Sequence, residues 1–250
     1  MLLVLIGALA IGVGLGLLGS GGSILTVPAL VYLAHQDEKV AIASSLGIVA
    51  GISIVAAIPY ARRRELDVRS VVRFGLPGIV GTFGGAWLAQ FVSARTQLEL
   101  LAGVMVLASV LMFRTQRAES EPGRDHPTWM IALEGLGVGV LTGLVGVGGG
   151  FLIVPALVLL GGLPMRRAVG TSLVIIALKS LVGFAKYVDV LADLGLSIDW
   201  SVLALFTGFG IAGSLLGSRL SSLVPQHALQ RVFSALLVLV GAGILWTHWR

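Results

Sequence analysis

The fold of this chain is decided by a stretch that occurs twice, GLLGSGGSILTVPALVYL at residues 16–33 and GLVGVGGGFLIVPALVLL at residues 143–160. The copies lie 127 positions apart and are identical at 12 of 18 positions. At an offset of 132 the similarity continues, with Asp67 falling on Asp199. The chain is therefore two copies of one unit, with a five-residue insertion in the second copy near residues 188–197.

The composition indicates a membrane protein. Of the 250 residues, 56% are hydrophobic, 12% are charged and 35 are glycine. Charged residues gather in short breaks between apolar stretches that are long enough to cross a bilayer. The net charge of +5 is explained by basic residues in the loops between membrane segments, where they orient the chain, so nucleic-acid binding is not expected.

We predict an all-α integral membrane protein in which each repeat is a glycine-broken helical hairpin followed by three transmembrane helices. The expected spans of the first half are near 40–60, 70–92 and 97–114, and those of the second half are near 168–187, 199–220 and 228–248. The predicted units are a first transmembrane repeat (1–114), a cytoplasmic linker (115–127) and a second transmembrane repeat (128–250). The first ten residues lack the basic segment of a cleavable signal, so we expect the N-terminus to be retained.

The charges in the loops predict that the two repeats are inverted. Arg62, Arg63 and Arg64 mark a loop of the first repeat as cytoplasmic, whereas the matching loop of the second repeat carries Asp189 and Asp193. In the resulting topology both termini lie outside the cell. Each broken stretch returns to the side from which it entered.

The two glycine breaks are the predicted binding sites. Glycines this dense interrupt a helix and expose backbone amides, and the helix that follows points its positive end at the break, which favours an anion. The alternative is a purely structural hairpin. Pro28 and Pro155 are expected in the early turns of the short helices, where a missing N–H costs least. The residues assigned to the breaks are Gly19, Ser20, Gly21, Gly22 and Ser23 in the first copy and Gly146, Gly148, Gly149 and Gly150 in the second.

Five further side chains are candidates for the same site. Ser44, Ser45, Thr171 and Ser172 occupy matching positions in the two repeats. Their hydroxyls either face the cavity or bond to carbonyls of their own helices. Lys179 lies within a membrane span, where a cation is costly and usually functional, and its repeat counterpart is Ile52. It is expected to attract an anion or to pair with a carboxylate such as Glu134, unless it extends to the interface.

Other patterns have structural explanations. Small residues four apart, such as Gly12 and Gly16 or Gly213 and Gly217, are typical of close helix packing. Asp67 and Asp199 are expected to be helix N-caps. No cysteine is present and the four histidines are isolated, so neither a metal site, nor a cofactor, nor a catalytic site is predicted.

The repeated G-x-GGG/S-x-x-x-VPAL pattern and the A-x-[ST]-S-L that follows it resemble those of the sulfite exporter TauE/SafE family, over nearly the whole chain. The resemblance implies a permease of the bacterial or archaeal plasma membrane for sulfite, sulfoacetate or a related organosulfonate. It assigns the motif to Gly19, Gly21, Gly22 and Pro28 and to their counterparts in the second copy. Ser23 replaces the third glycine of the motif.

The predicted function is therefore a secondary transporter, not an enzyme, that moves a small sulfur-containing anion across the cell membrane by alternating access. Its expected partners are that anion, the lipid bilayer and a coupling proton or sodium ion, with a homodimer as one option. An anion channel with a fixed pore and a membrane scaffold without transport are the alternatives.

Overall fold

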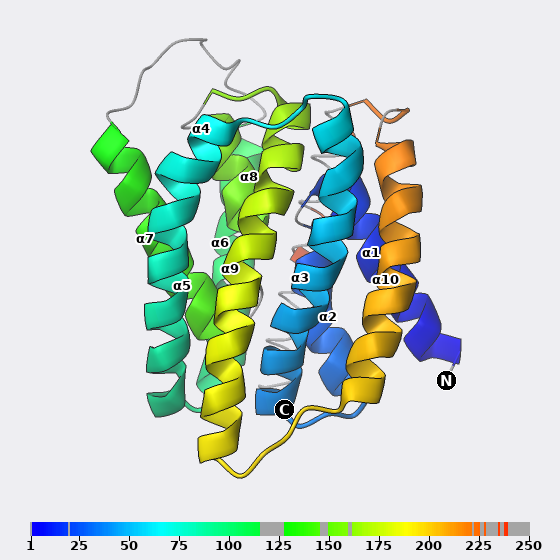
Figure 1. Cartoon of the computed structure of the whole chain (residues 1–250), viewed down its shortest axis with the longest axis vertical. Coiled ribbons are helices and arrows are strands. Elements are labelled where there is room, and N and C mark those ends of the chain that lie inside the picture. The colour runs from blue at the N-terminus through cyan, green and yellow to red at the C-terminus, as the bar shows by residue number, and fades with distance from the viewer. Residues whose placement is uncertain are drawn as a thin grey trace.

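The computed structural model describes residues 2–19, 21–115, 128–145, 150–159, 162–221 and 223–225, together with 228, 235, 238 and 239. Every regular element in these residues is a helix (Figure 1). In chain order they are α1 (Leu2–Leu18), α2 (Gly21–Tyr32), α3 (Glu38–Arg62), α4 (Val68–Ser70), the π-helical turn η1 (Val71–Gly75), α5 (Leu76–Leu88), the 3₁₀ turn η2 (Ala89–Phe91), α6 (Ala94–Thr115), α7 (Thr128–Val145), α8 (Gly150–Leu159), α9 (Met165–Asp193) and α10 (Trp200–Leu220).

Four of the described helical segments are long and apolar enough to cross a membrane: Glu38–Arg62, Val68–Phe91, Arg166–Asp193 and Trp200–Leu220. Two shorter apolar helices, Leu3–Leu18 and Trp129–Val145, belong to the glycine-broken stretches. The predicted all-helical membrane fold is thus confirmed. The linker at 116–127 lies outside the described residues, as does almost all of the span expected at 228–248.

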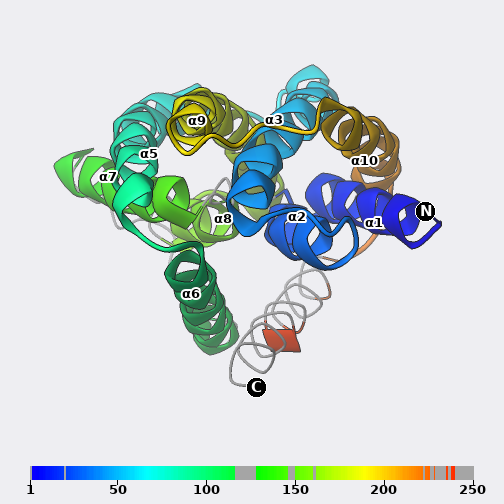
Figure 2. The ribbon, with the colours of Figure 1, turned by 90° about the horizontal axis from the view of Figure 1, so that it is seen from below.

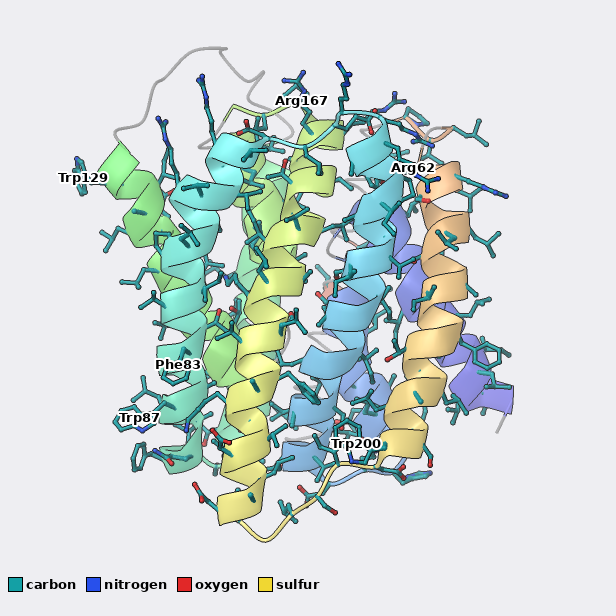
Figure 3. The ribbon with its side chains drawn as sticks, in the orientation of Figure 1. Arg62, Phe83, Trp87, Trp129, Arg167 and Trp200 are labelled. Atoms are coloured by element: carbon teal, nitrogen blue, oxygen red, sulfur yellow. The ribbon has the colours of Figure 1, made fainter. Side chains whose placement is uncertain are left out.

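Exposed tryptophans lie near both ends of the molecule. Trp129 is at one end, and Trp87 and Trp200 are at the other (Figure 3). Indole rings are enriched where a bilayer meets water, because they combine an apolar face with a polar N–H. The tryptophans therefore bracket the zone that the bilayer would cover.

Helices α3 and α9 run in opposite directions through the centre of the molecule and pack against each other (Figures 1 and 2). On one side of this pair α1 packs against α10, and on the other side α7 packs against α5. Because α1 and α5 belong to the first repeat and α7 and α10 to the second, each flanking pair joins the two halves of the chain. The repeats are thus interleaved.

Glycines allow these flanking pairs to pack closely. A Cβ atom at Gly12 of α1 would collide with the backbone of Gly210 in α10, and one at Gly139 of α7 would collide with the backbone of Gly78 in α5. Gly139 is the repeat counterpart of Gly12, and Gly210 is that of Gly78, so the same crossing occurs on both sides. The interpretation of the paired glycines as packing positions is confirmed.

The two ends of the molecule differ in charge. Arginines at the C-terminal end of α3 and the N-terminal end of α9 are exposed together at what we call the arginine-bearing end, which Figure 3 marks by Arg62 and Arg167. Helices α7 and α9 begin at this end, whereas α1 and α3 begin at the opposite end (Figure 1). The two broken stretches therefore enter the bundle from opposite ends.

Local chemistry accounts for the helix boundaries. The side chain of Asp67 accepts a hydrogen bond from Ser70 N, and that of Asp199 accepts from the backbone N–H of Ser201 and Val202, so both predicted N-caps are confirmed. The insertion near 188–197 falls where α9 continues to Asp193 beyond the length of α3.

The expected position of the two prolines is wrong. Pro28 is the eighth residue of α2 and Pro155 is the sixth of α8, so neither lies in the first turn. Helix α2 starts at Gly21 and helix α8 starts at Gly150, so the prolines fall inside the helices. There each proline lacks the N–H that would bond to the preceding turn.

Candidate functional site

The first glycine break forms a sharp reversal between α1 and α2. Gly19 has φ +72°, in the left-handed region that favours glycine, and its N–H donates to Leu15 O at 2.8 Å. Helix α2 then packs back against α1, and a Cβ atom at Gly22 would lie 2.9 Å from Leu15 Cγ and collide with Ile11 O. The break is thus a hairpin. Gly21 is the first residue of α2, and Ser20 lies outside the described residues.

Helix α9 of the second repeat contacts this break. Ser172 Oγ donates to Val169 O at 2.8 Å and reaches Gly19 O at 3.5 Å. A Cβ atom at Gly19 would lie 3.1 Å from Ser172 Oγ and 2.7 Å from Val169 Cγ1, so only glycine fits. Of the residues predicted from the sequence, Gly19 and Ser172 are therefore brought together, by helices from different repeats.

The other predicted hydroxyls have different surroundings. Ser45 Oγ donates to Ile42 O at 2.8 Å, as its counterpart Ser172 does to Val169 O. Thr171 Oγ1 accepts from Asp67 N at 2.9 Å and so anchors the loop before α4. Ser44 Oγ is buried and has no hydrogen-bond partner among the described residues. Ser23, near the start of α2, is fully buried.

The second break is outside the described residues at 146–149, which include Gly146, Gly148 and Gly149. Gly150 is the first residue of α8. The assignment of these glycines to the binding site stays a prediction.

Lys179 is fully buried near the middle of α9, and its Nζ has no hydrogen-bond partner among the described residues. The predicted pairing with Glu134 is therefore not formed. Its side chain extends along α5, since a Cβ atom at Gly78 would lie 3.2 Å from Lys179 Cδ and 3.3 Å from its Cε. A long, basic side chain is thus enclosed in the protein interior without a hydrogen-bonding partner in the part of the chain that the structure describes.

The repeat counterpart of this arrangement is apolar. Ile52 of α3 lies against Gly210 of α10, where a Cβ atom would collide with the Ile52 side chain. Ile52 is the counterpart of Lys179, and Gly210 is that of Gly78. The same groove therefore holds isoleucine in one half of the molecule and lysine in the other, so packing alone does not require a charge at position 179.

Two buried tyrosines and a glutamine at the broken helices were not predicted from the sequence. Tyr60 OH donates to Gly16 O at 3.0 Å, and Tyr187 OH donates to Leu144 O at 3.0 Å. Gln97 Nε2 donates to the same Leu144 O at 2.6 Å. The 127-residue offset places Tyr60 on Tyr187. This match of two tyrosines within apolar helices is the sequence feature from which both residues could have been predicted.

Comparison with known proteins places the chain among membrane transporters. The family model described as "Sulfite exporter TauE/SafE" matches residues 3–244. A probable membrane transporter protein of Xylella fastidiosa (strain 9a5c) is 33% identical over 247 residues, covering 96% of this chain and 92% of that protein. The probable membrane transporter proteins YunE of Bacillus subtilis and MJ0441 of Methanocaldococcus jannaschii are 26% and 25% identical, and each covers 98% of this chain.

No solved structure matches the chain. The sequence match nevertheless extends over both repeats, and several described helices are able to cross a membrane. The chain therefore belongs to the sulfite exporter TauE/SafE family of membrane transporters.

Proposed function

We propose that this protein is a secondary transporter that moves a small sulfur-containing anion, such as sulfite, sulfoacetate or a related organosulfonate, across the plasma membrane by alternating access. The family description names sulfite as the cargo of its members, which supports an anion of this class. The motif resemblance supports the same class for this chain.

The single observation that carries the proposal is Lys179. A buried ammonium group without a partner is unfavourable in an apolar interior, because nothing replaces the water it has lost. An anion that binds beside it removes this penalty. Since the equivalent groove of the other half holds Ile52, the lysine is better explained by a ligand than by packing.

The first glycine break supplies a second contact region. The first N–H groups of α2 have no partner within their own helix, and they lie at its positive end. Ser172 and Ser23 add hydroxyl groups nearby. Lys179 is seven residues, or about 10 Å, further along α9 than Ser172. We therefore assign these groups to successive positions on the path of one small anion.

The packing supports two inverted repeats that move against each other. Helices α3 and α9 are antiparallel, and the flanking helix pairs cross at equivalent glycines on both sides. Such a pair of broken hairpins entering from opposite ends is the arrangement from which alternating access arises. Arginines gather at one end, which we assign to the cytoplasm, so that both termini lie outside. A proton or sodium gradient is the proposed source of energy.

The test is uptake of radiolabelled sulfite into proteoliposomes. We expect Lys179→Ile, which recreates the residue of the other groove, to abolish saturable flux. Lys186→Ile is the matched control, because this lysine lies on the same helix but pairs with Asp189 at 3.5 Å near its end. Flux in Lys179→Ile equal to that in Lys186→Ile would refute the assignment of Lys179.

The same preparation separates a transporter from a channel. Alternating access predicts that unlabelled sulfite trapped inside accelerates the entry of labelled sulfite. Single-channel currents in planar bilayers, without such acceleration, would contradict the proposed mechanism.

A further inference from the structure

Because the glycine breaks end α1 and α7 early, the last carbonyl groups of these two helices need hydrogen-bond donors from elsewhere in the protein. The last four carbonyl groups of a helix have no regular partner within it, and inside a membrane protein each must find another donor. Gly16 belongs to the last turn of α1 and Leu144 to that of α7. Both carbonyls are bonded by tyrosine hydroxyls, from Tyr60 of α3 and Tyr187 of α9.

Each tyrosine also reaches a side chain of the other repeat. Tyr60 OH lies 3.0 Å from Ser221 Oγ, just beyond the end of α10. Because Tyr60 donates its one proton to Gly16 O, Ser221 Oγ is the donor of this bond, for which Ser218 O at 2.9 Å is the competing acceptor. Tyr187 OH accepts a hydrogen bond from Gln97 Nε2 of α6 at 3.1 Å. Thus the broken helix of each repeat is tied to a residue of the opposite repeat. The tie passes through Tyr60 in the first repeat, and in the second it passes through Tyr187 and also directly from Gln97 Nε2 to Leu144 O.

The residues that complete the two links are not repeat counterparts. At the 132-residue offset, Ser221 corresponds to Ala89 and Gln97 corresponds to Leu229. A residue of the opposite repeat therefore bonds to the tyrosine hydroxyl in both halves, but Ser221 does so with a hydroxyl group and Gln97 with an amide group. A duplicated sequence pattern alone does not account for it.

The two links lie toward opposite ends of the molecule. Tyr60 is two residues before Arg62, at the arginine-bearing end (Figure 3). Tyr187 is six residues before Asp193, the last residue of α9, which ends at the opposite end of the molecule (Figure 1). Both tyrosine side chains are buried, with exposures of 2% and 0%. In this structure both links are formed at the same time.

We propose that these links are two latches, each of which holds one broken helix against the opposite repeat and so closes one end of the transport path. The Tyr60 latch comprises Tyr60, Gly16 and Ser221, and the Tyr187 latch comprises Tyr187, Leu144 and Gln97. The tyrosines are positioning residues, since they act through the broken helices and not on the substrate. The inference rests on the alternating-access part of the proposed function, in which one latch opens while the other stays closed.

Side-specific labelling tests the latches directly. The chain contains no cysteine, so a single introduced thiol reports alone. Leu18→Cys and Val145→Cys are matched reporters, because Leu18 and Val145 are repeat counterparts, end α1 and α7, and are only 4% and 5% exposed. A membrane-impermeant maleimide is applied to right-side-out and to inside-out vesicles.

We expect Tyr60→Phe to raise the labelling rate of the Leu18→Cys reporter about fivefold from the arginine-bearing side, as the loss of one net hydrogen bond implies. The Val145→Cys reporter should keep its rate. Tyr187→Phe should raise labelling of the Val145→Cys reporter from the opposite side, but by a smaller factor, because Gln97 Nε2 still donates to Leu144 O. Tyr32→Phe, at a tyrosine with 43% exposure, serves as the control and should change neither.

An equal rise at both reporters would show general loosening and would overturn the latches, as would no change at either reporter. The unaffected reporter in each variant also shows that the protein is folded. Sulfite flux in the same vesicles distinguishes the two proposals. If the single-cysteine variants show the expected side-specific labelling but the cysteine-free parent carries no sulfite flux, the sulfur-anion assignment is refuted and the latches are supported.

Discussion

Replacing Gly139 with alanine should separate α7 from α5. The added Cβ atom would lie 3.0 Å from both Cα and C of Gly78 and would collide with its carbonyl oxygen. These are backbone atoms of a packed helix, so no side chain is able to move aside and the helices must shift. Gly137, two residues earlier on α7, has no atom within 4 Å of an added Cβ. It provides a control on the same helix.

The size of the effect follows from comparing the two variants. Both exchange glycine for alanine inside α7, so both gain the same helix propensity of about 0.5–1 kcal/mol. What distinguishes them is the cost of forcing a methyl group into a closed contact, about 1–3 kcal/mol. For a chain of this length, a difference of that order lowers the unfolding temperature of Gly139→Ala by about 2–12 °C relative to Gly137→Ala.

The assay is thermal unfolding of the detergent-solubilised protein, followed by the loss of the monodisperse peak in size-exclusion chromatography. The expected order of unfolding temperatures is Gly137→Ala above the parent and Gly139→Ala below it. Equal unfolding temperatures for the two variants would refute the conclusion that close glycine packing joins α7 to α5.

Two further predictions concern helix ends, and the same unfolding assay checks both. Asp199→Ala should destabilise the protein by about 1 kcal/mol, because it removes the carboxylate that accepts hydrogen bonds from Ser201 N and Val202 N and so caps α10. A variant with parental stability would argue against the cap. Lys39→Met should cost about 1.5 kcal/mol, because Lys39 Nζ donates to the carbonyls of Ala89 at 2.7 Å and Val92 at 2.8 Å, which lie at the start of η2 and just after it. An unchanged unfolding temperature would contradict this role.

Much of the architecture could be predicted from the sequence because it depends on local properties. Hydropathy over about 20 residues indicates a membrane helix wherever that helix packs. The duplicated glycine run placed the first break correctly at Gly19, since only glycine adopts the left-handed turn there without strain. The carboxylates of Asp67 and Asp199 were recognised as caps because a cap acts within its own first turn.

The proline prediction failed for a related reason. The number of residues between the last glycine and the proline was known, but the position at which the helix begins was not. That position depends on how α2 packs against α1, where Gly22 allows the two backbones to approach closely. Pro28 therefore ended up inside the helix.

The sequence by itself determined that this protein is a duplicated, helical membrane transporter of the TauE/SafE type with two glycine breaks. Only the tertiary structure decided which helices meet, namely α1 with α10 and α5 with α7 across the repeats. It also decided that Lys179 lies beside Gly78, with no hydrogen-bond partner for its Nζ within the described ranges. It also decided that Tyr60 and Tyr187 satisfy the carbonyls of the broken helices. The physical reason is that hydropathy and backbone preference are local, whereas close packing and the bonding of a freed carbonyl depend on residues far away in the chain.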